Sequence, residues 1–447
     1  MAGKPSRDDA FDLPFEIPES WKTARLSELC EFIRDGDWIE SKDQGGSDFR
    51  LLQISNIGVG RFIETSNYRW ITKETFARLN CTEILEGDVL VARMPEPTGR
   101  AWFVSALPWR AVTAVDVAIV RTRRKELDPR FLAYFLNSPA SLAQVASLTT
   151  GTTRLRIRRA DLEQRYIPVP PIAEQRAIAH ILGALDDKIE VNRRMSETPE
   201  EMARGLFESW FVRFDPVRAK MEGRDPGLPA DLADLFPDRL VDSELGEVPA
   251  GWEIGTFGAI IKERTERVAG RQAVVLSAVS SGKLVPSEEF FNKRVHSRDI
   301  SRYLLVEQGD FAYNPARINI GSIGMLQDDV VGAVSPVYVV FRPRKEFGWF
   351  LEFSLRRASV RAWIETLASG SVRQTLSYRD FASIPCVIPP VQLVEEFNKR
   401  WLTLREGIRS RDAESRTLAE IRDTLLPKLI SGELRVQDAE RLVAAAT

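Results

Sequence analysis

The sequence is poor in the residues that most often build metal sites and active sites. It has three cysteines and two histidines among 447 residues. Cys30, Cys81, Cys386, His180 and His296 lie far apart, and no zinc-ligand spacing can be assembled from them. We therefore expect no metal site and no histidine-based catalysis. Each of these side chains is expected to be an ordinary core or surface residue.

Long apolar runs and a strong charge of either sign are also missing. No stretch approaches the roughly 18 apolar residues of a membrane span, and the first twenty residues hold acids and prolines where a signal peptide has an apolar segment. The formal net charge of −2 is not that of a protein that coats nucleic acid without regard to sequence, although local basic patches remain possible. We expect a cytoplasmic protein of two to four domains.

What the sequence does contain is one long pattern, present twice. Residues 148–211 and 367–430 align without a gap at a constant offset of 219 positions. Each copy has a Gly-Thr or Gly-Ser turn, an acidic residue followed by an apolar one, a Pro-Pro pair and then a long helical pattern. The preceding stretches repeat at the varying offsets 231, 222 and 221, as in Trp21 and Trp252, Gly87 and Gly309, and Ile119 and Val340.

Both helical segments carry apolar residues at spacings of three and four, a narrow seam of the coiled-coil kind. A single exposed helix with one apolar seam needs a partner, and we expect the two copies to pair antiparallel. The expected seam residues are Ile178, Leu182, Leu185, Ile189 and Asn192 in the first copy, and Trp401, Leu404, Ile408 and Arg411 in the second.

The seam becomes polar near the middle of each copy, at Asn192 and Ser196 and again at Arg411 and Ser415. In an antiparallel pair the two middles meet, so polar residues there would fix the register at some cost in stability. These side chains could instead simply face water. Pro199 lies inside the first segment and is preceded by Thr198. The two residues together predict a kink or a fresh helix start at this point.

The rest of the chain predicts two similar mixed domains. Short strand-like runs broken by glycine-containing turns precede each helical segment, which indicates an α+β fold with an internal pseudo-two-fold repeat. The expected boundaries are a first α+β domain at 1–170, a first long helix at 171–213, a Pro/Gly/Asp-rich linker at 214–245, a second α+β domain at 246–389, and a second long helix with a C-terminal tail at 390–447.

Two short motifs suggest chemistry but are incomplete. Asn314-Pro315-Ala316-Arg317 lacks the second proline and the aromatic residue of an adenine methyltransferase loop, and no glycine-rich cofactor loop accompanies it. Asp186-Asp187-Lys188 has the ending of a metal-nuclease motif, but it lies on an amphipathic helix, where a solvated face explains it better. We expect no catalytic, cofactor-binding or metal-binding residue in this chain.

The most suggestive basic cluster follows the repeated Gly-Thr/Ser turn. In a strand, Arg154, Arg156 and Arg158 would share one face, next to a turn whose backbone amides could meet phosphate. The alternative is a charged surface loop. Candidate DNA contacts in this region are Gly151, Thr152, Thr153, Arg154, Arg156 and Arg158, with Gly370, Ser371, Arg373, Gln374 and Arg379 at the second copy.

Arginine suits guanine edges, and asparagine and glutamine suit adenine edges. On that basis, the candidate base-reading residues on or beside predicted strands are Gln53, Asn56, Arg93, Asn314, Arg317 and Asn319. The two halves differ at most of these places, so an asymmetric site follows.

Taken together, the motifs resemble those of the specificity subunit of type I restriction–modification systems. The resemblance is carried by residues 168–194, 205–217, 236–254 and 422–434, and by Gly-Asp pairs at 87–88 and 309–310. It spans nearly the whole chain. Departures are the start of the second helix, which lacks the Glu-Gln of residues 174–175, and Pro199.

The resemblance implies two target-recognition domains, each reading half of a split DNA site, and two conserved helices that separate them. It implies as partners double-stranded DNA, two modification subunits that bind S-adenosylmethionine and methylate adenine, and restriction subunits that use ATP and magnesium. No cofactor is expected on this chain itself. Two alternatives remain open: a coiled-coil assembly adaptor, and the specificity subunit of a methyltransferase-only system.

Two readers on one scaffold must meet the same face of the duplex, so the half-sites should lie about one helical turn apart. We therefore expect a bipartite, nonpalindromic site with several unread base pairs between its halves.

Overall fold

The computed structural model describes residues 11–150, 155–290, 299–368 and 375–446, and the chain divides into two compact units. The first unit comprises residues 1–194 and 411–447, and the second comprises residues 195–410. The expected segments Gly151–Arg154 and Gly370–Gln374 lie outside the described residues. Both units combine sheets with helices, so the expected α+β fold is confirmed.

The first unit is built on a four-stranded antiparallel sheet in the order β2–β8–β5–β6. Its strands are β2 (Cys30–Asp35), β8 (Val117–Thr122), β5 (Val89–Ala92) and β6 (Ala101–Phe103). Valine, isoleucine and leucine dominate the two central strands, and β5 is buried on both faces. This sheet is the rigid platform of the unit.

Two smaller sheets complete the strands of the first unit. In the order β4–β3–β7, β3 pairs parallel with β7 and antiparallel with β4, while β1 pairs antiparallel with β9. The bounds are β1 (Lys22–Arg25), β3 (Phe49–Leu52), β4 (Trp70–Ile71), β7 (Ala111–Thr113) and β9 (Tyr166–Val169). The β1–β9 pair brings the start of the unit to the chain just before the first long helix.

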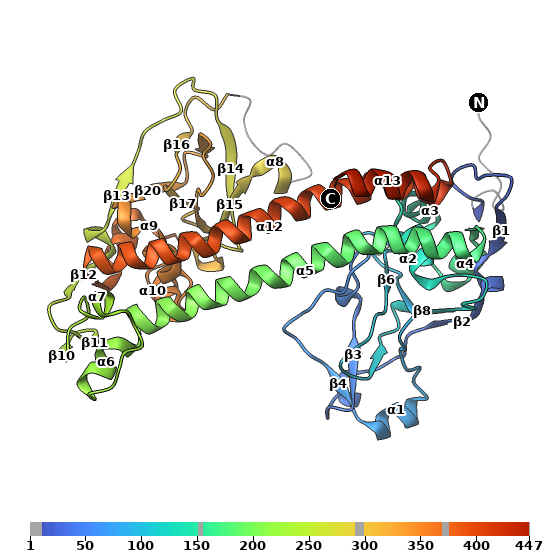
Figure 1. Ribbon diagram of the computed structural model, residues 1–447, viewed down its shortest axis with the longest axis horizontal. Helices are drawn as coiled ribbons and strands as arrows, with labels where there is room; N and C mark the ends of the chain where they lie inside the picture. Colours follow the sequence, from blue (N-terminus) through green and yellow to red (C-terminus); the bar gives the residue numbers. More distant parts are fainter. Residues whose placement is uncertain (1–10, 151–154, 291–298, 369–374, 447) are drawn as a thin grey trace. The chain divides into compact units, whose positions relative to one another are not determined.

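The shorter helices of the first unit follow local capping signals. Helix α2 (Pro129–Asn137) starts with proline, and the Asp128 carboxylate accepts hydrogen bonds from the backbone N–H groups of Arg130 and Phe131. It packs on β5 and β6 (Figure 1). The remaining helices are α1 (Lys73–Leu79), α3 (Pro139–Leu148), α4 (Arg159–Gln164) and α13 (Val436–Ala446).

The second unit repeats this plan. Its antiparallel sheet has the order β13–β20–β17–β18, in which each strand occupies the place of β2, β8, β5 and β6 respectively. The strands are β13 (Ile261–Arg264), β20 (Val339–Pro343), β17 (Phe311–Tyr313) and β18 (Ile323–Met325). The internal repeat expected from the sequence offsets is therefore confirmed in the topology.

The other elements of the second unit also have counterparts in the first. Strand β14 pairs parallel with β19, as β3 does with β7, and β12 pairs with β21, as β1 does with β9. The strands are β12 (Glu253–Thr256), β14 (Val274–Val279), β15 (Lys283–Pro286), β16 (Leu304–Val306), β19 (Gly332–Val334) and β21 (Pro385–Ile388). The helices are α8 (Ser287–Phe290), α9 (Gly348–Leu355), α10 (Ala358–Leu367) and α11 (Tyr378–Ala382).

The long helices α5 (Ile172–Phe211) and α12 (Val391–Ser431) pack together in antiparallel fashion. In the first unit, the Arg422 guanidinium donates to Asp186 at 2.7 Å, and the Asn192 amide donates to Glu414 at 2.7 Å. Because later residues of α5 meet earlier residues of α12, the two helices run in opposite directions. The seam residues Ile178, Leu182 and Leu185 are buried in the first core with Leu418, Leu425 and Leu429.

In the second unit, the same two helices meet through aromatic side chains. Phe207 and Phe211 each lie with ring centroids 5.6 Å from Phe397, and Trp210 is 1% exposed. In sequence alone, Phe207, Trp210 and Phe211 fit either an exposed docking surface for a partner or a core. Their burial assigns them to the core.

Prolines lie inside both long helices without ending them. Pro199 lies within α5, and Pro427 lies within α12. The expected fresh start at Pro199 is therefore wrong, because the helix continues to Phe211.

The segment 214–245 is folded, whereas its composition had suggested a linker. It contains α6 (Asp215–Met221), α7 (Ala230–Ala233) and β10 (Leu240–Ser243), which pairs with β11 (Gly246–Pro249). The apolar residues between its prolines and glycines, Phe214, Val217, Leu232 and Phe236, are buried in the core of the second unit. Four such side chains are enough to pack a Pro/Gly-rich segment onto a domain.

Candidate nucleic-acid interface

In both units, a short segment is hydrogen-bonded to the loop that follows a central strand. The segment precedes α4 in the first unit and α11 in the second, and the strand is β5 in the first unit and β17 in the second. In the first unit, the Ile157 N–H donates to the Arg93 carbonyl oxygen at 3.0 Å. In the second, the Leu376 N–H donates to the Pro315 carbonyl oxygen at 3.1 Å. Both Ile157 and Leu376 are fully buried, and they are related by the offset of 219.

We call this junction of loop and segment the strand-end junction. It contains residues 93–100 with 155–159 in the first unit, and residues 314–322 with 375–379 in the second. It brings together candidates that are about sixty residues apart in sequence, such as Arg93 and Arg156. A polar surface that occurs in both units, with different side chains, is the expected form of a duplicated reader.

The repeated Gly-Asp pairs form the turns that lead into β5 in the first unit and into β17 in the second. Gly87 and Gly309 have φ values of 91° and 86°, a region that favours glycine. The buried Asp88 carboxylate accepts from the Leu85 N–H at 2.8 Å and from Arg121 at 2.7 Å. The motif is thus a structural one, because the ion pair lies between neighbouring strands β5 and β8.

The second Gly-Asp pair makes the same contacts with one addition. Asp310 is fully buried and accepts from the Glu307 N–H at 2.8 Å. It is paired with Arg342 at 2.6 Å and with Arg264 at 2.7 Å. Arg342 and Arg121 are related by the offset of 221, so the duplicated ion pair follows from the sequence repeat.

The structure corrects two of the expected base-reading residues. Arg93 is 3% exposed; it donates to the Val115 carbonyl oxygen at 2.6 Å and pairs with Asp35 at 3.0 Å. Asn56 is 4% exposed; its amide donates to the Ile63 carbonyl oxygen at 3.0 Å and accepts from the Gln53 N–H at 2.8 Å. Both side chains are already used inside the unit and cannot reach a base edge. The half-buried Gln53 stays a candidate.

The expected strand with three arginines on one face is not formed by the described residues. Arg154 is outside them. Arg156 forms an isolated bridge with Thr150, and Arg158 is the residue before α4, where it pairs with Asp161 through two hydrogen bonds of 2.6 and 2.7 Å. Arg158 stands at the N-cap position of α4 but makes no cap hydrogen bond with its side chain, whereas at the equivalent position of the second unit the Ser377 hydroxyl accepts from the Asp380 N–H.

In the second unit, the expected candidates lie at or beside the strand-end junction. Asn314 is half-buried and its side-chain oxygen accepts from the Ala316 N–H at 3.0 Å, which folds the loop back on itself. Arg317 and Arg379 are exposed, and neither has an ion-pair partner within the described part of the chain. Asn319 is half-buried beside them. Arg317 and Arg379 are consequently the most accessible cations of this junction.

The candidates Gly151, Thr152, Thr153 and Arg154, with Gly370, Ser371, Arg373 and Gln374, lie outside the described residues. Their assignment as DNA contacts stays a prediction.

Sequence reasoning missed Arg50 and Arg100, two buried arginines that hold loops of the first unit in place. Arg100 is 7% exposed and donates to four backbone carbonyls, those of Ile54, Ile57, Met94 and Pro97. It therefore ties two loops together. Nothing in the local sequence distinguishes it from the surface arginines, because two of the four carbonyls, those of Ile54 and Ile57, come from a segment some forty residues away.

Arg50 is 3% exposed and is held by Glu64 and by the rings of Tyr68 and Trp109, whose centroids lie 4.6 and 4.5 Å away. It fixes the loop that follows β3. Only its alternation with apolar neighbours in FRLL hinted that it would point into a packed region.

The middle of the helix pair is polar, as expected, and Asn192 meets the expected Ser415 together with Glu414. The Asn192 amide is 3% exposed; it donates to Glu414 at 2.7 Å and lies 3.4 Å from the Ser415 hydroxyl. Lys188 pairs with Glu414 at 3.3 Å. Among the described contacts, Asn192 meets Glu414 and Ser415 and not Arg411, because an antiparallel offset brings the next turn of α12 opposite it. The neighbouring seam residue Ile189 is partly buried; in the second unit, Trp401, Leu404 and Ile408 are buried or partly buried.

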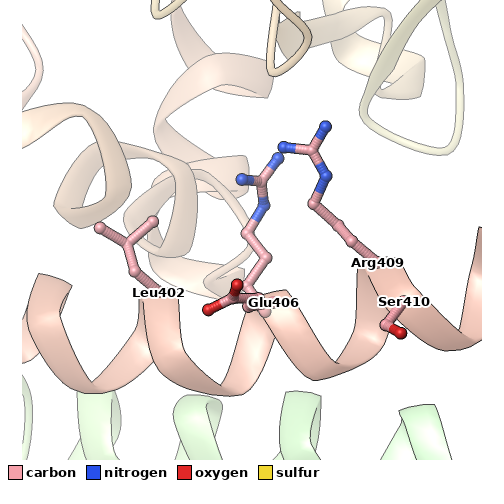
Figure 2. Close-up of a pocket in the computed structure, with 5 residues that line it drawn as sticks. Leu402, Glu406, Arg409 and Ser410 are labelled. Carbon is pink, nitrogen blue, oxygen red and sulfur yellow. The ribbon is translucent and has the colours of Figure 1, made fainter.

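The hollows of the second unit do not form a recognisable active site. One, of about 490 Å³, follows α12 and is lined by Leu402, Arg405, Glu406, Arg409 and Ser410. Figure 2 shows Arg409 extended away from the helix, where it lies 3.4 Å from Asp328. Arg405 donates to Gln327 at 2.9 Å. These side chains are engaged with a loop and carry no nucleophile beside a base.

A larger hollow of about 950 Å³ is lined by both acids and bases, among them Glu352, which pairs with Arg356 at 2.8 Å. In the described residues, no three acidic, histidine or cysteine side chains converge as metal ligands would. Among the helices that the structure describes, none is at once long and apolar enough to cross a membrane.

Comparison with known proteins shows what this chain is similar to in sequence and in fold. Residues 18–198 match the family model described as the type I restriction modification DNA specificity domain. The specificity subunit of the type I restriction enzyme HindI from Haemophilus influenzae is 24% identical over 417 residues, covering 78% of this chain and 87% of the relative. The MjaIX specificity subunit from Methanocaldococcus jannaschii is 22% identical and covers 95% of each chain.

A crystal structure of the S subunit of a type I restriction–modification system from M. genitalium has the same fold. Its TM-score is 0.53 at 16% sequence identity, and the match covers 94% of this chain and 98% of that chain. Residues 18–198 thus match a type I restriction modification DNA specificity domain, and most of the chain is similar in sequence to type I specificity subunits.

Proposed function

We propose that this chain is the DNA-recognition subunit of a type I restriction–modification complex and that it reads a bipartite, asymmetric site in double-stranded DNA. The observation that carries the proposal is the strand-end junction. It occurs once in each unit and is closed in both by the equivalent backbone hydrogen bond. Two copies of one reader on one chain suit two half-sites. The relatives named as specificity subunits support the same role.

The asymmetry of the site follows from the side chains at the two junctions. The first presents Arg156 and Arg159, whereas the second presents Thr375 and Tyr378 at the equivalent positions and adds Arg317. Because different donors and acceptors select different bases, the two half-sites should differ in sequence.

We further propose that the chain assembles with two modification subunits and with restriction subunits in the cytoplasm. S-adenosylmethionine, ATP and magnesium would be bound by those partners, while this chain contributes recognition and no catalytic step.

The test is to co-express the chain with the modification subunit encoded beside it and to map methylated adenine in the host DNA by single-molecule sequencing. A split, nonpalindromic motif that appears only when both subunits are present is the expected result. One continuous or palindromic motif would contradict the proposal. A stable complex that binds DNA without sequence preference would instead support a coiled-coil assembly adaptor.

A further inference from the structure

Five charged side chains gather at the strand-end junction of the first unit. Arg93 pairs with Asp35 at 3.0 Å, Arg159 approaches Asp35 at 4.0 Å, and Arg156 pairs with Asp116 at 3.5 Å. Arg93 is buried, whereas the Arg156 and Arg159 side chains are 40% and 45% exposed. Arg159 also pairs with Glu163 at 3.1 Å, so Arg156 is the half-exposed cation of this cluster that is held by a single carboxylate.

The second unit has none of these charges at the matching positions. Sheet register relates Asp35 to Thr265 and Asp116 to Val337, while the constant offset relates Arg156 to Thr375 and Arg159 to Tyr378. The counterpart of Arg93 is Pro315, which accepts the same backbone hydrogen bond. Both members of the Arg156–Asp116 pair are therefore replaced together by uncharged residues, so the scaffold itself does not need the pair.

The backbone of Arg156 is fixed while its side chain is accessible. Its N–H and carbonyl both bond to Thr150 at 3.0 Å, and the next residue, Ile157, is fully buried. The Arg156 side chain is 40% exposed, and its single carboxylate partner, Asp116, is 35% exposed. A lone ion pair of this length at the surface is weak, so the guanidinium can exchange partners at little cost.

Arg158, by contrast, is not available for exchange. Its two short bonds to Asp161 hold the start of α4. A bidentate pair is stronger and better oriented than the single 3.5 Å contact of Arg156. Of the described arginines in this expected contact region, Arg156 is the one poised to leave its carboxylate.

We propose that Arg156 is a DNA-phosphate contact peculiar to the first unit, and that Asp116 holds its guanidinium in the unbound protein and releases it to phosphate on binding. The proposal rests on the proposed function, because it assumes that this junction faces the duplex. It makes the backbone attachment of the two half-sites unequal. The exchange needs no chemistry beyond replacing one anion by another.

The test is a double-mutant cycle on the assembled complex with its modification subunits. The variants are Arg156→Thr, which introduces the residue of the second unit, Asp116→Asn, and both together. The affinity for the mapped DNA site is measured at several salt concentrations. Arg156→Thr should reduce the salt slope by about one, and Asp116→Asn should raise affinity by up to about fivefold. The gain from Asp116→Asn should vanish in the Arg156→Thr background.

If Asp116→Asn still raises DNA affinity in the Arg156→Thr background, the loss of a negative charge near the DNA is enough to explain the higher affinity. That result would overturn the proposed exchange of partners. An unchanged salt slope in Arg156→Thr would overturn the contact itself. Lys125→Thr is the matched control, since Lys125 is an exposed cation beyond the other end of β8; its slope should match that of the wild type. Thermal unfolding of each variant separates these outcomes from misfolding.

The reciprocal variant Thr375→Arg should raise the salt slope by about one if the second junction faces the duplex in the same way. The failure of this proposal differs from failure of the proposed function. If the wild-type complex shows no preference for any DNA sequence, the function is wrong. If it recognises a split site but Arg156→Thr behaves like the wild type, only the role of Arg156 is wrong.

Discussion

At the scale of single residues, most charged groups that look functional in the sequence are structural. Asp88 and Asp310 are buried and paired with arginines on the adjacent strand. Arg93 pairs with the Asp35 carboxylate and donates to the Val115 carbonyl oxygen. Such buried groups are poor candidates for contacts with DNA, because a charged side chain that turned outward would lose its hydrogen-bond and ion-pair partners. Accessible arginines with weak or no partners are therefore the better candidates.

Glu352 provides a prediction at this scale. Burial raises the pKa of Glu352 above the usual range of a glutamate, while the nearby Arg356 opposes that shift. The folded state then binds the proton more tightly than the unfolded state does. Stability of the second unit should fall as pH rises from the unfolded pKa of about 4.3 through the raised folded pKa, and then level off.

Glu352→Gln should remove this pH dependence and should make the second unit more stable than the wild type at pH 8. Chemical denaturation at pH 4 to 8 measures it. Glu365→Gln, an exposed glutamate on the neighbouring helix α10, is the control and should follow the wild-type curve. If Glu352→Gln lowers stability at pH 8, the ion pair with Arg356 outweighs the cost of burying the carboxylate.

At the scale of elements, the two long helices combine an apolar seam with one buried polar contact. Asn192 is surrounded by the seam but bonds to the largely exposed Glu414, which Lys188 also holds. An apolar side chain would pack there at least as well. A buried asparagine that bonds one particular partner favours one register over the alternatives, at some cost in stability.

Asn192→Leu should therefore raise the free energy of unfolding of the first unit, by about 1 kcal/mol. Glu414 keeps Lys188 and water as partners, so little is lost. Denaturant unfolding of the purified chain measures the change, with Arg193→Leu, on the exposed side of α5, as control. Destabilisation by 1 kcal/mol or more would show that the amide stabilises the helix pair and does not merely select its register.

At the scale of the whole molecule, each unit has its own large core. One core contains residues from 203 to 408, and the other contains residues from 21 to 185 together with 418 to 439. No residue belongs to both. Since a core stabilises only the unit that it fills, damage to one should leave the other intact.

The duplicated Gly-Asp ion pair offers matched variants for this expectation. Asp88→Asn should lower the stability of the first unit by about 3–5 kcal/mol, because Arg121 loses its buried partner. Asp310→Asn should lower that of the second unit in the same way. Differential scanning calorimetry should resolve two transitions, each variant shifting a different one. If both variants shift one common transition, the units unfold as one cooperative body.

Much of the fold could be predicted from the sequence. The constant offset of the helical segments and the varying offsets of the preceding strands predicted two α+β domains and an antiparallel helix pair, and the structure confirms them. The folded segment 214–245 was missed, because proline and glycine mark turns whether or not the residues between them pack. Only contacts with α5 and the second core show that Phe214 and Phe236 are buried.

The sequence by itself determined the repeat, the periodicity of the seam and the identity of the residue types that could touch DNA, since these depend on spacing along the chain. The tertiary structure alone decided which of those residues are accessible. Arg93, Arg156 and Arg158 look alike in sequence, yet one is buried, one is loosely paired and one holds a helix start. Their partners Asp35 and Asp116 lie on other strands, and charge neutralisation between distant segments leaves no local signal.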